Sequence, residues 1–376
     1  MMKNIFVPLL ALSLCGVAGL AHDTGTVAVP DATPAVQSLK TEVEKSGPVR
    51  APAALKEKIP VSGQGFWKFI AATNLMPLPP EVVGKVTPAH GTVIVDAERD
   101  IVYWGLKKVG WVGFSNQLRD SWVVKGDEQF THNNLHGADI LPRKGKLPLV
   151  AAADNEGFKV YLSDTTFLNP RTLGAPTNGP YATNVTYRPT DTAFVNANRI
   201  FITDGYARGY FMEATTEPLA YVDGFFGGHD FSKTPHGITF DPRDKNLLVS
   251  ARPEGQLKRW SISGKKVLEI GALPAGTLLC DVDLWGDYAL AACLEGPFND
   301  GSTNKTAGPL MIVNLKKKTI ASIIKPKAEL GYDFCEHIHD ACWYFRKHGR
   351  ATDVYLIFTA WNPGGLGVLK LVNAPD

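Results

Sequence analysis

The sequence predicts an all-β protein, a six-bladed β-propeller that follows a signal peptide and a flexible leader. Two observations lead to this prediction. From Phe66 onward, short apolar or alternating runs are separated by Gly, Asp, Asn and Pro roughly every 8 to 12 residues, and no sustained helical period occurs. Six of these runs also align as the openings of repeats that have the size of a propeller blade.

The first 21 residues have the composition of a secretory signal peptide. Lys3 supplies a positive charge, residues 5–14 form an apolar stretch, and residues 19–21 provide a small-residue cleavage site. The apolar stretch is too short to span a membrane comfortably. We therefore expect a secreted protein, extracellular or periplasmic, that has no membrane span.

The remaining chain divides into a leader and one large domain. Residues 22–65 are rich in Ala, Pro, Val, Lys and Glu and contain no aromatic residue, which is typical of a flexible segment. Residues 66–376 are long enough for a single all-β domain with a sizeable core. The net charge is +2 and 20% of the residues are charged, so nothing indicates a nucleic-acid partner. We expect a monomer that binds a small-molecule substrate.

Removal of the signal peptide leaves four cysteines, an even number that favours disulfides in an exported protein. Cys280 and Cys293 flank an expected hairpin, so our first choice pairs them and leaves Cys335 with Cys342. Four cysteines allow three pairings, and the sequence does not decide among them. Asn184 and Asn304 begin N-glycosylation sequons, which matter only in a eukaryotic glycoprotein.

The six repeats account for residues 85–372 as one propeller. Their openings lie 44 to 59 residues apart, and each is followed by two further apolar runs. A β-sandwich would not produce six openings in the same register. The openings start at these residues: His90, His136, Pro189, His236, Cys280 and His339.

Histidine opens four of the six repeats. The innermost strand of each propeller blade lines a central channel, so residues in one register converge on the propeller axis. Three imidazoles around one point, with a fourth position open, are what a catalytic zinc site requires, and iron accepts the same ligands. The alternative is that these histidines only bind one another and trapped water.

The pattern resembles the lyase domain of peptidylglycine α-amidating enzymes, a six-bladed propeller of the NHL-repeat type. The segments "LHGADI", "TPHGITF" and "IHDACW" resemble the zinc-histidine segments of that family. The resemblance implies that His136, His236 and His339 are zinc ligands. It also implies that Asp340, after the third histidine, helps to hold a structural calcium ion.

The same resemblance extends to two residues with a catalytic role. "PTDTAFV…TDGY" is similar to the blade that carries the proposed catalytic base of the family, and its tyrosine matches Tyr206. "SARPEGQLKRW" is similar to a segment that places an arginine, here Arg252, beside that tyrosine. Arginine and a metal-bound oxygen would favour the phenolate form of Tyr206.

The chain also departs from the family pattern. The first blade has Lys107 where the family has a substrate-binding arginine, and His90 and His337 are additional. We expect these three as additional channel residues. Because the chain has no copper monooxygenase domain to supply a hydroxyglycine substrate, the amidating reaction itself is not predicted.

The sequence therefore predicts a secreted, metal-dependent, lyase-type enzyme that acts on a small hydroxyl or carbonyl substrate. Aromatic residues in blades more often pack between neighbouring blades, but several could line the channel mouth instead and would then favour an apolar or aromatic substrate: Trp104, Trp111, Trp122, Phe225, Phe226, Trp343 and Trp361. A dehydratase or hydrolase is compatible with the same site. The alternatives are a metal-independent cyclase of a natural-product pathway and a non-catalytic binding propeller.

Overall fold

The computed structural model describes residues 40–41, 59–88, 90–183, 185–231, 234–297, 307–349 and 351–372. Contacts divide the chain after Ala35, and all described residues belong to the second unit. The expected signal peptide and the two sequon asparagines, Asn184 and Asn304, lie outside the described residues.

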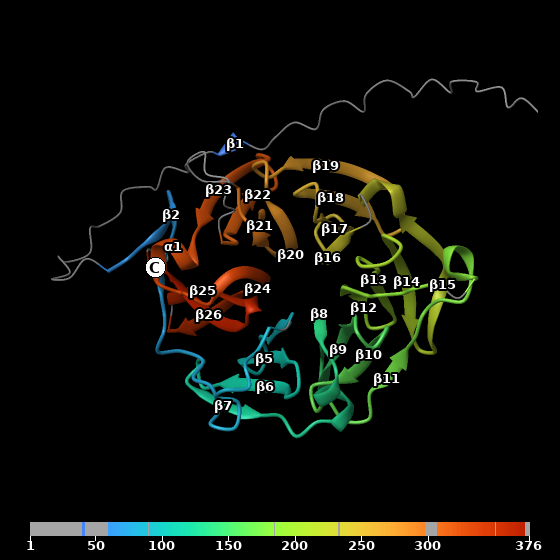
Figure 1. Ribbon diagram of the computed structural model, residues 1–376, viewed down its shortest axis with the longest axis horizontal. Coiled ribbons are helices and arrows are strands. Elements are labelled where there is room, and N and C mark those ends of the chain that lie inside the picture. The colour runs from blue at the N-terminus through green and yellow to red at the C-terminus, as the bar shows by residue number, and fades with distance from the viewer. Residues whose placement is uncertain are drawn as a thin grey trace, which may run out of the picture. The chain divides into compact units, whose positions relative to one another are not determined.

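Six sheets surround a central axis in chain order, which confirms the predicted six-bladed propeller (Figure 1). Each sheet is one blade, and neighbouring strands within it are antiparallel, apart from the parallel addition of β1 to β23. From the innermost strand outward, blade 1 consists of β4 (Val93–Asp96), β5 (Ile101–Leu106), β6 (Gly110–Ser115) and β7 (Asp120–Val123). Blade 2 consists of β8 (Leu135–Arg143), β9 (Lys146–Asp154), β10 (Lys159–Asp164) and β11 (Arg171–Leu173). Blade 3 consists of β12 (Asp191–Asn196), β13 (Arg199–Thr203), β14 (Tyr210–Thr216) and β15 (Leu219–Gly227). Blade 4 consists of β16 (Pro235–Asp241), β17 (Asn246–Ala251), β18 (Gln256–Ser261) and β19 (Lys266–Ala272). Blade 5 consists of β20 (Leu278–Trp285), β21 (Tyr288–Glu295), β22 (Leu310–Asn314), β23 (Thr319–Ile324) and β1 (Lys40–Thr41). Blade 6 consists of β24 (Cys335–His348), β25 (Ala351–Pro363), β26 (Gly365–Leu371), β3 (Trp67–Ala71) and β2 (Ser62–Gln64).

Strands from residues 62–71 and from residues 335–371 together build blade 6 and so close the ring. Strand β3 pairs with β26, and the register places Ala71 opposite Leu369 and Phe69 opposite Leu371. This pairing covers the outer edge of β26, which would otherwise present unpaired backbone groups. Strand β2 of this blade begins at Ser62 and β1 of blade 5 at Lys40, both within the segment that was expected to be a leader.

The helical content is small and confined to connections. The short helices are η1 (Glu128–His132), η2 (Gly179–Tyr181), η3 (Gly228–Phe231) and α1 (Pro326–Leu330). Within the described ranges, no helix has the length and apolar character needed to cross a bilayer.

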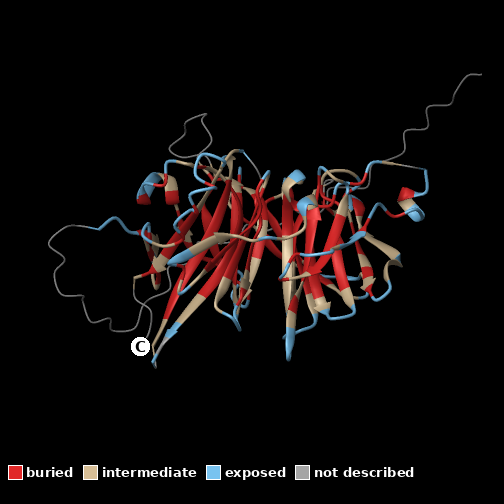
Figure 2. Cartoon of the chain, turned by 90° about the horizontal axis from the view of Figure 1, so that it is seen from below, coloured by how far each residue is buried: buried red, intermediate tan, exposed pale blue. Residues whose placement is uncertain are grey.

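Apolar side chains fill the spaces between neighbouring blades, and six such clusters form the core. In the side view, buried residues occupy the strands and exposed residues concentrate in the loops (Figure 2). The aromatic residues expected at the channel mouth mostly belong to these clusters, namely Trp104, Trp111, Trp122, Phe225, Phe226 and Trp343. These six residues pack between blades, which is the alternative to the channel mouth that the sequence left open. Trp361 instead stacks against the His90 ring at 6.1 Å.

Buried aspartates bind four of the six inner strands to the inner strand of the next blade. Each carboxylate accepts a hydrogen bond from a backbone N–H of the following inner strand, at 2.7 to 3.0 Å. The pairs are Asp139 with Phe194, Asp191 with Ile238, Asp283 with Trp343 and Asp340 with Val93. An inner strand is an exposed edge on its channel side, so these bonds satisfy donors that have no partner in their own sheet.

Asp139→Asn is expected to change how stability depends on pH. Burial raises the pKa of Asp139 from 3.8 to about 7. Between about pH 4 and pH 7 the Asp139 carboxyl group is therefore protonated in the folded protein but ionised in the unfolded chain. Because the folded state binds the extra proton, Asp139 increases the free energy of unfolding as the pH falls through this window. The stability advantage of the wild type over the variant should increase by up to about 4 kcal/mol between pH 8 and pH 4. Urea unfolding at several pH values measures this difference, and a constant difference would contradict the role of Asp139.

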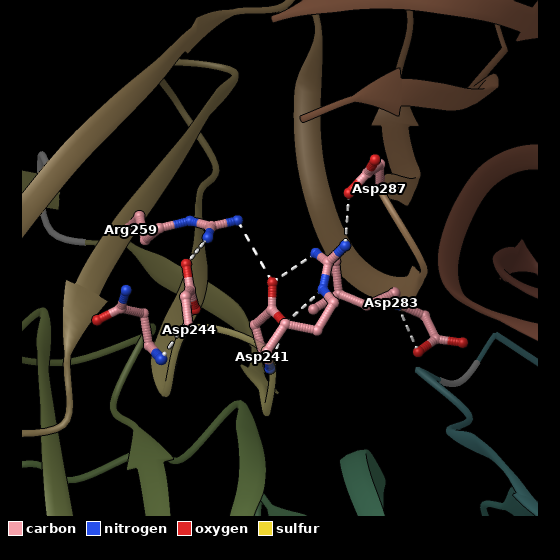
Figure 3. Close-up of polar contacts among 8 residues, drawn as sticks. Asp241, Asp244, Arg259, Asp283 and Asp287 are labelled. Atoms are coloured by element: carbon pink, nitrogen blue, oxygen red, sulfur yellow. Dashed lines mark hydrogen bonds and ion pairs between the residues drawn. The ribbon is translucent and has the colours of Figure 1, made fainter. Parts of the chain in front are cut away.

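Ion pairs between the β16–β17 turn and the β20–β21 turn connect blades 4 and 5. Figure 3 shows Asp241, Asp244 and Asp287 around two guanidinium groups. Arg243 binds Asp241 at 2.6 Å within blade 4 and Asp287 of blade 5 at 2.8 Å. The Arg243–Asp287 pair is exposed, so we expect only a small contribution to stability.

Candidate metal centre

Four inner strands contain a β-bulge at the same level of the channel. In β8, for example, Leu135 pairs with Asp154 of β9 and Ala138 pairs with Ala152. Three residues along β8 are therefore opposed by two residues along β9. A bulge re-aims the side chain of its extra residue. The bulges contain His136 in β8, His236 in β16, Cys280 in β20 and His339 in β24.

Glycine follows two of these histidines because the next blade leaves no space for a side chain. A Cβ atom on Gly137 would lie 2.4 Å from Asp191 Oδ1 and 2.5 Å from the Thr190 carbonyl oxygen. A Cβ atom on Gly237 would lie 2.8 Å from the Cys280 carbonyl oxygen. The His-Gly pairs in the sequence thus reflect close contact between blades around the channel.

Gly137→Ala is expected to destabilise the fold by about 1–3 kcal/mol, because the added methyl group must displace backbone and a buried carboxylate. Chemical unfolding measures this loss. Gly174→Ala is the matched control, since a Cβ atom on Gly174 meets nothing within 4 Å. Equal stability of the two variants would contradict the close contact.

The histidine rings converge at the centre of the channel. His136, His236 and His339 are buried, and His90 is partly buried. The distances between ring centres are 4.3 Å for His90–His136, 4.7 Å for His90–His339, 4.4 Å for His136–His339, 4.6 Å for His136–His236 and 5.0 Å for His236–His339. The predicted convergence of residues that are far apart in the sequence is therefore present.

Backbone carbonyls fix the tautomers of two rings. His136 Nδ1 lies 2.6 Å from the Thr190 carbonyl oxygen, and His236 Nδ1 lies 3.0 Å from that of Cys280. A carbonyl oxygen only accepts, so each Nδ1 carries the hydrogen and each Nε2 presents a lone pair. Carbonyl contacts of this kind orient metal-binding histidines.

His339 is the least satisfied residue of the cluster. Its side chain is 2% exposed, and among the described residues neither ring nitrogen has a hydrogen-bond partner. An unpaired buried polar group costs about 1–3 kcal/mol. Burial also lowers the pKa of His339 well below 6.5, which favours the neutral form that binds metals. A bound metal ion would satisfy this ring.

Two overlapping sets of side chains have ligand atoms within 4.8 Å of one another, and both contain His339. One set is His90, His136 and His339, and the other is His236, Cys280 and His339. The expected trio of histidines is thus brought together, but His136 and His236 fall in different sets. Imidazole and thiolate donors fit zinc best, whereas imidazole alone also fits iron.

Tyr206 and Arg252 lie beside the histidines, as expected. The Tyr206 hydroxyl is 3.0 Å from Nε2 of both His136 and His236, and Arg252 Nη1 donates to it at 2.8 Å. Arg252 Nη2 donates to His236 Nε2 at 2.5 Å, so the hydroxyl hydrogen of Tyr206 is directed to His136. The tyrosine is held in the site by three partners.

The protonation state of Tyr206 depends on its burial and on the charges around it. Burial raises the pKa of its phenol above 10, and the nearby Arg252 charge offsets this only in part. The phenol is therefore protonated at neutral pH in this structure. In this environment the phenol is a proton donor, and the expected phenolate form also requires the metal-bound oxygen.

Cys280 belongs to the site, which sequence reasoning missed. Its sulfur accepts a hydrogen bond from Arg252 Nη2 at 2.9 Å. The signal was present in the sequence, because Cys280 opens its repeat in the register that histidine occupies elsewhere.

The expected disulfides are absent from the described structure, where Cys280, Cys293, Cys335 and Cys342 are all free and buried. Cys335 and Cys342 lie seven residues apart on one strand, about 23 Å at full extension, far beyond bonding distance. Cys280 is turned toward Arg252 by its bulge. The prediction of disulfides from an even cysteine count was therefore wrong.

The remaining predicted residues lie around the cluster. His337 packs against Trp361 with ring centres 5.5 Å apart, and Lys107 Nζ forms an ion pair with Glu156 at 2.6 Å. Asp340 does not point at the histidines, because its carboxylate binds the Val93 N–H in the layer beside them. A void of about 10 Å³ separates these layers, lined by His136, His236, His339, Asp191, Asp281 and Asp340, among others.

Comparisons with known proteins support the fold but no family. No family model matches the chain, and no curated protein sequence is similar to it. Among solved structures, a gluconolactonase from Xanthomonas campestris has a TM-score of 0.52 and 11% identity, covering 81% of this chain and 97% of its own. At this identity the similarity concerns the fold alone, and the resemblance to an amidating-enzyme lyase domain stays an expectation.

Proposed function

We propose that this chain is a metal-dependent, hydrolase-like enzyme that acts on the carbonyl or hydroxyl oxygen of a small apolar or aromatic substrate. The observation that carries the proposal is the buried His339 ring, which has no hydrogen-bond partner among the described residues and lies among three other imidazoles. His236, Cys280 and His339 form one set that would hold zinc, with iron as the second choice, and His136, which shares the other set with His339, would be the fourth ligand.

The protein groups around this centre suit hydrolysis of an ester or lactone. Bound zinc would polarise a carbonyl oxygen and supply a nucleophilic water at neutral pH. Tyr206 keeps its proton and is placed to donate it to a leaving oxygen, while Arg252 fixes the phenol. The fold similarity to a gluconolactonase supports the same reaction class. Trp361, stacked beside His90, supports an apolar or aromatic substrate.

A lyase is the second candidate function. It is favoured by the resemblance of "LHGADI", "TPHGITF" and "IHDACW" to the zinc-histidine segments of the amidating-enzyme lyases. Elimination requires a base, and Tyr206 could serve as one only after losing its proton. We place the hydrolase first because the fold similarity to a gluconolactonase supports it.

Three further properties are part of the proposal. Residues 1–21 support export, and the closed ring of blades supports a monomer. Asp340, with Asp191 and Asp281 beside the void, offers carboxylate oxygens of the kind that calcium prefers, which supports a second, structural cation.

Turnover assays on metal-loaded and chelator-treated protein test the function. We expect hydrolysis of some member of a panel of aromatic lactones and small aryl esters, lost on chelation and restored by zinc or iron. Elimination from β-hydroxy carbonyl compounds, with no ester hydrolysis, would favour the lyase. Turnover that survives chelation would contradict metal dependence and favour a metal-independent cyclase, whereas binding without turnover would favour a binding propeller.

A further inference from the structure

His90 differs from the other histidines in how the chain holds it. It lies before β4 rather than in a bulge, and it contacts the Asn134 amide twice. The His90 backbone N–H donates to Asn134 Oδ1 at 3.2 Å, and Asn134 Nδ2 lies 2.6 Å from His90 Nδ1. These two bonds fix both the position of the ring and its orientation.

The surroundings of Asn134 determine which atom donates to His90. Oδ1 receives the backbone N–H, so it is the acceptor end of the amide. Nδ2 also lies 3.1 Å from Glu156 Oε1 and 3.4 Å from Asn155 Oδ1, both of which only accept. Glu156 is held in turn by Lys107. The amide nitrogen is therefore the donor, and His90 Nδ1 must accept.

An imidazole whose Nδ1 accepts carries its hydrogen on Nε2. This polarity is opposite to that of His136 and His236, whose Nδ1 atoms donate to backbone carbonyls. A nitrogen that carries a hydrogen has no lone pair in the ring plane for a metal. His90 therefore cannot serve as a metal ligand in this arrangement, although a nitrogen of its ring lies within 4.8 Å of the His136 and His339 ligand atoms.

We propose that His90 is a hydrogen-bond donor of the active site, which Asn134 fixes as the Nε2–H tautomer so that it binds an oxygen atom of the substrate. This inference rests on the proposed function, because it places the substrate oxygen at the same centre. The ring lies 4.3 Å from His136 and 4.7 Å from His339, centre to centre, so an oxygen held by the cluster is within its reach. The substrate class is one with a carbonyl or developing oxyanion, which gains from a fixed donor.

Nitrogen NMR on protein labelled at histidine tests the tautomer directly, without a substrate. We expect the long-range spectrum of His90, assigned with His90→Gln, to show hydrogen on Nε2. In Asn134→Asp the carboxylate can only accept, so the hydrogen should move to Nδ1. A His90 ring that carries hydrogen on Nδ1 in the wild type would overturn the inference.

Metal content and kinetics then show whether His90 acts as a hydrogen-bond donor or as a metal ligand. His90→Ala should keep the wild-type metal content and lose about 10²–10³ in kcat, the usual cost of a lost oxyanion donor. His90→Gln retains an N–H in place of Nε2–H and should restore most of that loss. Loss of metal in His90→Ala, or unchanged kcat, would overturn the inference. If the wild type binds no metal and turns nothing over, the proposed function fails, while the NMR result still decides the tautomer.

Discussion

Replacement of His339 by leucine is expected to remove both the metal and the activity. His339 belongs to both sets of ligand atoms, so no complete set survives its loss. A metal ion supplies several kcal/mol of transition-state stabilisation, so kcat should fall at least roughly 10³-fold. Because the wild-type ring has no partner among the described residues, leucine should not destabilise the metal-free fold. Metal analysis, turnover and thermal unfolding measure the three effects.

His132→Leu is the matched control for this substitution. The His132 side chain is 72% exposed on η1 and lies 3.8 Å from Glu128. This variant should keep full metal content and activity. Full metal content in His339→Leu would contradict the assignment of His339 as a ligand.

Tyr206→Phe is expected to lower kcat by about 10²–10⁴, the usual range for loss of a proton-transferring group. The substitution removes the hydroxyl that contacts His136, His236 and Arg252 but leaves the histidines and Cys280 in place. Metal content should therefore be unchanged. Steady-state kinetics with the substrate found in the lactone and ester panel measure this effect.

Tyr187→Phe provides the comparison for the loss of a buried hydroxyl elsewhere. Tyr187 is buried in the core between blades 2 and 3, where its hydroxyl accepts a hydrogen bond from that of Tyr221 at 2.8 Å. We expect some loss of stability and no loss of kcat. If Tyr206→Phe behaves like Tyr187→Phe, the hydroxyl of Tyr206 takes no part in the reaction.

The histidine register was predictable because the propeller converts a sequence repeat into spatial convergence. Four inner strands share a bulge, and the residue in each bulge faces the axis, so His136, His236 and His339 meet. Cys280 occupies the same place in its repeat. An even cysteine count favoured a disulfide instead, although the repeat itself indicates a channel position.

Other features depend on packing that one sequence does not display. Whether an aromatic residue faces the channel or the next blade depends on strand twist and register, and Trp104 and Trp111 are buried between blades. The role of His90 depends on the orientation of one amide, that of Asn134. The protonation of Tyr206 depends on its burial, which outweighs the single neighbouring charge of Arg252.

Metal analysis of the purified mature wild-type protein tests the central claim most directly, namely that buried imidazoles in the channel hold a metal ion. After incubation with zinc or iron(II) and removal of the unbound ion, the account predicts one equivalent at this centre for each chain, and none in His339→Leu. A wild-type protein that is folded and retains neither metal would contradict it.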